Sequence, residues 1–231
     1  MTGFDDLTRL SPPPAAAPPP SDWDEIENTL GIRLPRDYKN LADTYGPGAF
    51  CRFLHVYHPL GATQWVALTG PMPATLRRLL EDIRARDARL VRYDPRNLFA
   101  IGVTDNGEHL FWITEPATDP DAWHVAVNEA RGRGWYTHPG TLTDFLAAFL
   151  GGRTTVPLFP RGLLDHGATF TPSTPGTGGP WPPGPLELTG RSVSTRVVRE
   201  WARANGYEVP DRGRVPREIL DAWNQAEGER S

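Results

Sequence analysis

The chain has 231 residues, and 39% of them are hydrophobic, which is enough for one domain with a substantial core and a smaller second module. Its formal net charge of −4 excludes a protein that coats nucleic acid or anionic membrane through overall charge, so any such contact must come from a local basic patch. The sequence shows no signal peptide and no apolar run long enough to span a membrane, and we therefore expect a cytoplasmic protein without a membrane partner.

A Pro/Ala-rich tail at residues 1–20 is the first predicted element. Its PPPAAAPPP run favours extended backbone, because proline locks φ and lacks an amide donor, so we predict that the tail stays outside the core. A helix follows, in which Ser21 and Asp24 resemble a capping box and Gly31 marks the end. Three apolar stripes at helical spacing predict further helices, with Leu34, Tyr38, Leu41 and Tyr45 in the first, Leu76, Leu79, Leu80 and Ile83 in the second, and Leu142, Phe145, Leu146, Phe149 and Leu150 in the third.

Strands are predicted between these helices. The segments at 97–103 and 108–114 flank Asp105, Asn106 and Gly107, which tolerate positive φ and indicate a hairpin turn. The segment at 123–130 adds another strand beside them. An antiparallel sheet flanked by helices makes an α+β fold, and we place this body at residues 21–165.

Four stretches of the body occur in a recognisable order, namely WDEIENTLGIRLPRDYKNLADTYGPGAF, FAIGVTDNGEHLFWI, DPDAW and GTLTDFLAAFL. In order and spacing they closely resemble the SUKH superfamily of the Smi/Knr type. Members of that superfamily are known as immunity proteins that bind and block toxins, and others act as scaffolds in signalling. The resemblance therefore implies a domain that binds an unidentified protein partner, a toxin being one candidate, and the fold alone does not name that partner.

No pattern in the body points to catalysis, a metal or a cofactor. The histidines show no metal-ligand spacing, and Cys51 stands alone, so we interpret Cys51 as a buried structural residue. Glycine-rich phosphate loops and nucleophile elbows are also missing. We expect a protein that is not an enzyme, with no catalytic residue, no metal and no cofactor. The histidines concerned are His55, His58, His109, His124 and His138.

Acidic residues crowd the start of the helix that follows the tail. They are Asp22, Asp24, Glu25 and Glu27. The helix dipole and solvation account for them without any partner. The alternative is an acidic surface that faces a toxin, because complementary charge would suit a basic toxin.

A Pro/Gly-rich segment at residues 166–186 is predicted to link the body to a C-terminal module at 187–231. Its TPSTPGTGGPWPPGP stretch is typical of an interdomain linker. In the module, an apolar stripe through Trp201 ends at Gly206, and a second stripe through Trp223 begins behind Pro216. We predict two short helices that pack through the two tryptophans and hold an arginine loop at their corner.

That loop contains Arg212, Gly213 and Arg214. Between Arg191 and Arg217 there are seven arginines and three acidic residues, a net charge of +4 within an acidic protein. Gly213 lets the backbone approach a groove floor while its neighbours reach along the groove, and a narrow A·T-rich minor groove attracts guanidinium groups. Three further arginines share a helical face that can meet phosphates, namely Arg196, Arg199 and Arg203.

A second Arg-Gly-Arg occurs at residues 131–133, so the tripeptide alone is weak evidence. There the flanking residues are strand-like, and the pattern indicates a turn or bulge with solvated arginines. The alternative for the C-terminal arginines is a solvated basic helix pair that docks on the body.

The stretch VVREWARANGYEVPDRGRVPREILDAWNQA is very similar to the C-terminal DNA-binding domain of the Lsr-type nucleoid proteins, H-NS-like silencers of A·T-rich DNA. The resemblance implies minor-groove entry by Arg212, Gly213 and Arg214 and a backbone contact by Arg199. Pro210 departs from the family pattern, in which a polar residue often precedes the position of Asp211, and it removes one hydroxyl contact. The family's own oligomerisation domain is absent.

We therefore expect a nucleoid-associated protein whose module binds A·T-rich double-stranded DNA and whose body binds a protein, together regulating or silencing A·T-rich loci. The competing hypothesis is an immunity protein that neutralises a toxin and whose C-terminal module only localises it. A third possibility is a structural scaffold that binds neither.

Overall fold

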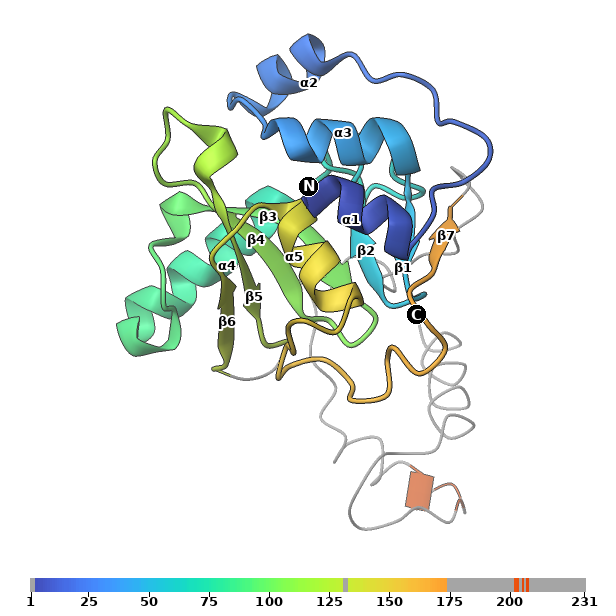
Figure 1. Cartoon of the computed structure of the whole chain (residues 1–231). Coiled ribbons are helices and arrows are strands. Elements are labelled where there is room, and N and C mark those ends of the chain that lie inside the picture. The colour runs from blue at the N-terminus through green and yellow to red at the C-terminus, as the bar shows by residue number, and fades with distance from the viewer. Residues whose placement is uncertain (1–2, 131–132, 174–201, 204, 206, 208–231) are drawn as a thin grey trace. The chain divides into compact units, whose positions relative to one another are not determined.

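The computed structural model describes residues 3–130, 133–173, 202, 203, 205 and 207 (Figure 1). The chain divides into two units, Met1–Trp181 and Pro182–Ser231. Almost all described residues belong to the first unit, and the predicted arginine loop and helix pair of the module lie outside the described residues apart from single positions. The fold given below is therefore that of the first unit.

The described part of this unit begins with three helices, and strands and helices follow in mixed order. The helices are α1 (Gly3–Leu10), α2 (Trp23–Leu30), α3 (Arg36–Tyr45), α4 (Met72–Arg86) and α5 (Leu142–Leu150), with short 3₁₀ turns η1 (Ala88–Leu90), η2 (Pro95–Asn97) and η3 (Pro120–Ala122). The strands are β1 (Gly48–Phe50), β2 (Leu54–Val56), β3 (Leu98–Thr104), β4 (His109–Ile113), β5 (His124–Asn128), β6 (Trp135–His138) and β7 (Phe170–Pro172).

These strands form one sheet in the order β6-β5-β4-β3-β2-β1-β7, and every described pairing is antiparallel. Helices α1, α3 and α5 lie together over one face of the sheet, and α4 lies on the other (Figure 1). The prediction of an α+β body with an antiparallel sheet flanked by helices is confirmed. The hairpin turn is confirmed as well, because Gly107 has a φ of 95° and its amide donates to the Thr104 carbonyl between β3 and β4.

Aromatic side chains fill both faces of the sheet. On one face Trp112 packs edge-on against Tyr38 of α3, with ring centroids 5.1 Å apart. On the other face Phe111 lies 5.9 Å from Trp135 of β6. Successive residues of a strand point to opposite faces, so the neighbours Phe111 and Trp112 serve both layers. The largest fully buried side chains include Trp112, Tyr38, Tyr57, Phe50, Phe111 and Phe145.

The predicted tail is wrong for its first half. Residues Gly3–Leu10 form α1, and Leu7 is completely buried. The Tyr45 hydroxyl donates to the carbonyl oxygen of Ser11 over 2.5 Å, which holds the end of α1 against α3. The prediction extended the proline run back to residue 1, although the run begins only at Pro12, after the helix has ended.

The predicted linker also begins too early. Phe170–Pro172 forms β7, and the Phe170 ring lies 5.0 Å from both Tyr45 and Phe50. Burial of an aromatic ring between two others stabilises this strand despite the surrounding glycines and prolines. The first part of the segment at 166–186 is thus part of the sheet.

Smaller differences concern individual side chains. Asp22, and not Ser21, caps α2, because its carboxylate accepts from the Glu25 amide at 3.1 Å. Leu79 points outward with 51% of its surface exposed, although it was predicted to share the apolar face of α4. Cys51 is only half-buried and has a positive φ of 53° in the turn between β1 and β2.

Candidate protein-binding and DNA-binding sites

Helix α2, the residues just before it and the loop after β2 line a groove of about 300 Å³, which we call the α2 groove. Its apolar lining comes from Ile26, Pro59 and Leu60, and Leu60 is one of the few large apolar side chains exposed among the described residues, at 39%. The remaining lining residues are Pro20, Ser21, Asp22, Glu25, Thr29 and Thr69. An apolar floor with a few polar groups at the rim is typical of a binding groove.

Glu27 fixes the α2 side of the groove. Its carboxylate is buried, accepts from the Leu34 amide at 2.8 Å, and forms ion pairs with Arg33 and with Lys39 of α3. Burial by itself would raise the pKa of Glu27, but the hydrogen bonds from Lys39 and Leu34 and the charges of Lys39 and Arg33 lower it below its usual value. Glu27 is therefore a structural anion, and its interpretation as a solvated acid is wrong.

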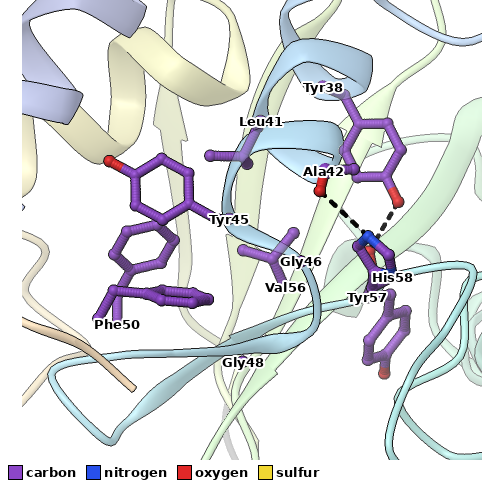
Figure 2. A pocket seen from close by; sticks show the side chains of 11 residues that line it. Tyr38, Leu41, Ala42, Tyr45, Gly46, Gly48, Phe50, Val56, Tyr57 and His58 are labelled. Atoms are coloured by element: carbon purple, nitrogen blue, oxygen red, sulfur yellow. Dashed lines mark hydrogen bonds between the residues drawn. The ribbon is translucent and has the colours of Figure 1, made fainter. Parts of the chain in front are cut away.

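His58 fixes the opposite side of the groove. Its Nδ1 accepts from the Leu60 amide at 2.9 Å, so the proton sits on Nε2, which donates to the Ala42 carbonyl oxygen at 3.2 Å (Figure 2). Burial lowers the pKa of His58, although the contact with Ala42 and the charge of Asp43 act in the other direction. A neutral imidazole thus holds Leu60 at the rim of the groove.

The rim carries negative charge. Asp22 and Glu25 are exposed, and neither forms an ion pair with any basic side chain that the structure describes. Such a rim around an apolar floor favours a segment that combines a basic and an apolar side chain. The α2 groove is our candidate protein-binding site.

A second hollow lies under α3 and has a volume of only about 10 Å³, space for a single water molecule (Figure 2). Tyr38, which lines it, donates its hydroxyl hydrogen to the Tyr57 carbonyl oxygen at 2.8 Å. Burial raises the pKa of both tyrosines. These neutral, buried phenols serve the core, and the hollow is too small for an organic ligand.

The predicted histidines are dispersed over the body. His55 Nε2 lies 2.8 Å from Asp105 Oδ1. The ring centroids of His109 and Phe111 are 6.4 Å apart, and burial lowers the pKa of His109 to about 4. Among residues 3–130 and 133–173, no three side chains of the metal-binding types come close enough to hold an ion. No helix in the described part of the chain is long and apolar enough to cross a membrane.

The predicted DNA-binding residues lie almost entirely outside the described residues. This holds for Arg196, Arg199, Arg212, Gly213 and Arg214. Arg203 is described, and it is exposed on a helical position next to the buried Ala202, whose carbonyl accepts from the Tyr207 amide at 2.9 Å.

The second Arg-Gly-Arg falls between β5 and β6 in the sequence, and Arg133 is the residue of it that the structure describes. The Glu129 amide donates to the Gly134 carbonyl oxygen at 2.9 Å, and Arg133 is exposed. Its setting in a β-hairpin differs from the helix-flanked setting that the sequence predicts for Arg212 and Arg214.

Sequence reasoning missed the α2 groove. Leu60 and Ile26 are far apart in the chain, and no pattern in either segment shows that they meet. The one available signal was the unpaired acidic character of Asp22 and Glu25, which suggested a charged surface but not the apolar floor beside it.

Two family models match the chain. The model of the SMI1 / KNR4 family (SUKH-1) matches residues 17–149, and the model of the Lsr2 DNA-binding domain matches residues 190–226. The first match spans α2 to α5, and the second includes every arginine of the predicted DNA-binding set. Both resemblances drawn from the sequence are confirmed. No solved structure matches the chain.

Proposed function

The chain belongs to the SMI1 / KNR4 family (SUKH-1), and we propose that it is a non-enzymatic adaptor whose body holds a protein at A·T-rich DNA. The chain also carries an Lsr2 DNA-binding domain, which makes DNA a partner. That second match is the observation on which the proposal chiefly rests. In this proposal the protein associates with the nucleoid and regulates or silences A·T-rich loci there.

Arg212, Gly213 and Arg214 are the proposed minor-groove readers. The A·T-rich minor groove is narrow and strongly negative, so it favours two guanidinium groups, and Gly213 between them allows the backbone to come close. Minor-groove edges distinguish A·T from G·C pairs but little else. The expected preference is therefore for base composition and not for one sequence.

Arg196, Arg199 and Arg203 are the proposed phosphate contacts. Their spacing of three and four residues puts them on one helical face, and the described Arg203 is exposed. Phosphate contacts carry no sequence information. Each phosphate that an arginine neutralises releases its counterions, so each contact adds to the salt dependence of binding. Loss of Arg199 should weaken binding to A·T-rich and G·C-rich duplexes alike and reduce the salt slope by about one.

The α2 groove supports the protein-binding half of the proposal. Its acidic residues Asp22 and Glu25 and its apolar lining, which includes Leu60, suit a basic partner segment with one apolar anchor. The same observation favours a second candidate function, an immunity protein whose body neutralises a basic toxin. A toxin gene adjacent to the gene for this chain would favour the second candidate.

Fluorescence anisotropy of the full chain with A·T-rich and G·C-rich duplexes, at two salt concentrations, tests the DNA-binding half. We expect an A·T preference that the pair Arg212→Ala and Arg214→Ala abolishes. The matched control is Arg131→Ala with Arg133→Ala, which removes the same two charges from the other Arg-Gly-Arg and should leave the preference intact. Equal loss of binding in both double variants would contradict groove reading by Arg212 and Arg214.

A further inference from the structure

The two edges of the sheet differ in how they are closed. The outermost strands are β7 at one edge and β6 at the other. An edge strand presents unpaired amide and carbonyl groups, and proteins usually block at least some of them. Alternate residues of an antiparallel edge strand point these groups away from the sheet, so the register of each edge identifies the exposed groups.

At the β7 edge, Pro172 occupies an outward-pointing position. The Ser173 amide donates to the Pro47 carbonyl and the Cys51 amide to the Thr169 carbonyl, so residues 169, 171 and 173 bond inward to β1. Pro172, paired with Gly48, therefore turns its nitrogen outward. Proline has no amide hydrogen there, and the β7 edge cannot accept a further strand in full register.

At the β6 edge the outward-pointing residues are Trp135 and Thr137. The Glu129 amide donates to the Gly134 carbonyl, and the register pairs Asn128 with Trp135, so the residues that bond inward to β5 are 134, 136 and 138. Trp135 and Thr137 thus turn two amides and two carbonyls outward, and no residue in the described part of the chain pairs with them. Both residue types favour strands, and neither blocks pairing as proline does.

Side chains of described residues hold β6 in place through contacts on its two faces. The Trp135 ring packs edge-on against the Tyr93 ring, with ring centroids 5.6 Å apart, and the Thr137 hydroxyl is hydrogen-bonded to the Tyr93 hydroxyl. On the opposite face, Tyr136 packs against Phe145 of α5. All of these contacts lie on the two faces of the strand, because side chains stand roughly perpendicular to the sheet. A strand that is already fixed, and whose outward groups have no partner among the described residues, costs little entropy to pair.

We propose that a second copy of this chain pairs antiparallel with β6 across a twofold axis through Tyr136. In that register Trp135 faces Thr137 of the second copy, and the two pairs exchange four backbone hydrogen bonds. The sheets of both copies then continue into one another. The strand is self-complementary because its two outward residues lie symmetrically about Tyr136.

Charge is compatible with this pairing. Arg133, the described charged residue that precedes β6, would face Pro139 of the second copy, which lacks an amide hydrogen and so ends the pairing at Trp135 and Thr137. The two Arg133 side chains then start six residues apart along the strands. At about 3.3 Å per residue that separation is roughly 20 Å, beyond the screening length at physiological salt. A strand pairing of this size buries little surface, so we expect a weak dimer that forms in the micromolar range and above.

Sedimentation velocity of the full chain over a concentration series tests the pairing, with two substitutions at one position. Thr137→Pro removes an outward-pointing amide hydrogen from β6, as Pro172 does in β7, and should give a monomer. Thr137→Val is the matched control, because it also loses the hydroxyl contact to Tyr93 but keeps the amide, and it should dimerise like the parent. A monomeric parent at several hundred micromolar, or a Thr137→Pro variant that still dimerises, overturns the proposal.

A cross-linking measurement covers the case in which Thr137→Pro fails to fold. Tyr136 faces its own copy in the proposed register as a non-hydrogen-bonded pair, whose Cα atoms lie about 4.5 Å apart, within reach of a disulfide. Tyr136→Cys in a Cys51→Ser background should cross-link on oxidation, whereas Thr104→Cys in the same background, a position in β3 remote from the edge, should not. Absence of a Tyr136→Cys cross-link in folded protein contradicts the pairing.

The dimer has a consequence for DNA that rests on the proposed function. Two DNA-binding domains in one particle raise the effective concentration of the second, so Thr137→Val should bind a duplex with two A·T-rich sites at least about tenfold more tightly than Thr137→Pro. The two failures are distinguishable. A monomer that binds A·T-rich DNA leaves the proposed function standing without the dimer, and a dimer without DNA binding leaves the pairing standing without that function.

Discussion

The Tyr45 hydroxyl donates a hydrogen bond of 2.5 Å to the carbonyl oxygen of Ser11, and through it helix α3 holds the end of helix α1. Burial raises the pKa of Tyr45 to about 12, so the phenol stays protonated and keeps donating at any physiological pH. The segment before the proline run is thus part of the folded body, and its removal should cost stability.

Leu7 provides the direct test of that role. Its side chain is fully buried between α1 and the body, so Leu7→Ala should lower the free energy of unfolding by about 2–5 kcal/mol. Leu79→Ala is the matched control, because Leu79 is 51% exposed on α4 and its loss should change stability by less than about 0.5 kcal/mol. Urea titration measures both. Equal effects would contradict a structural role for α1.

Glu27 should stabilise the body in a pH-dependent way. Its folded-state pKa is lowered from a usual value of 4.5, so the contribution is complete above that pH and is lost as the pH falls through the folded-state pKa. Glu27→Gln leaves Lys39 without its buried partner and should cost about 1–3 kcal/mol at pH 7. It should also flatten the acid limb of stability against pH.

The control for Glu27 is Glu25→Gln on the same helix. Glu25 is exposed and forms no ion pair with the described basic residues, so its loss should change stability by only a few tenths of a kcal/mol. The denaturant midpoints of the parent and of both variants at pH 7 and pH 3 test this prediction. A Glu27→Gln variant that loses as much stability on acidification as the parent would contradict the assignment.

His58 should make the Leu60 loop sensitive to acid. Its folded-state pKa is lowered from 6.5, so the stability that its neutral ring contributes is present above that pH and is lost as the pH falls from there toward the folded-state pKa. Protonation places a hydrogen on Nδ1, which then cannot accept from the Leu60 amide. Protection of that amide against hydrogen exchange, corrected for the intrinsic pH effect, should fall between pH 7 and pH 5.

His58→Asn is the matched variant for this measurement. Its amide oxygen can accept from Leu60 and does not titrate, so the pH dependence of protection should disappear. Titration of His58 by NMR gives an independent reading. A pKa at or above the usual 6.5 would show that the ring is not held neutral by burial.

Local patterns were sufficient for most of the elements. Apolar stripes at helical spacing placed α3 and α5, and the turn residues at 105–107 placed the hairpin of β3 and β4, because these signals depend only on neighbours in the chain. Where the local pattern was ambiguous, the predicted secondary structure was wrong. The proline run hid α1, and the linker composition hid β7, since in both cases the stabilising contacts come from distant residues such as Tyr45 and Phe50.

The candidate sites divide in the same way. The predicted arginine set lies within one short stretch of the chain, so its charge and spacing are visible in the sequence alone, and this stretch falls inside the matched domain at residues 190–226. The α2 groove is not contiguous. Leu60 and Glu25 line it from segments far apart in the chain, and His58, which is anchored on Ala42 of α3, accepts from the Leu60 amide.

The sequence by itself therefore determined the α+β class, the two-part organisation and the presence of a DNA-binding domain, because each depends on periodicity or on a continuous motif. Only the tertiary structure decided that the first residues belong to the body and that an acidic groove with apolar side chains exists. It also decided that, among the described strands, β6 and β7 form the edges of the sheet and Pro172 lies on the outer side of β7. Burial and strand register are set by packing between residues far apart in the chain, and no local pattern encodes them.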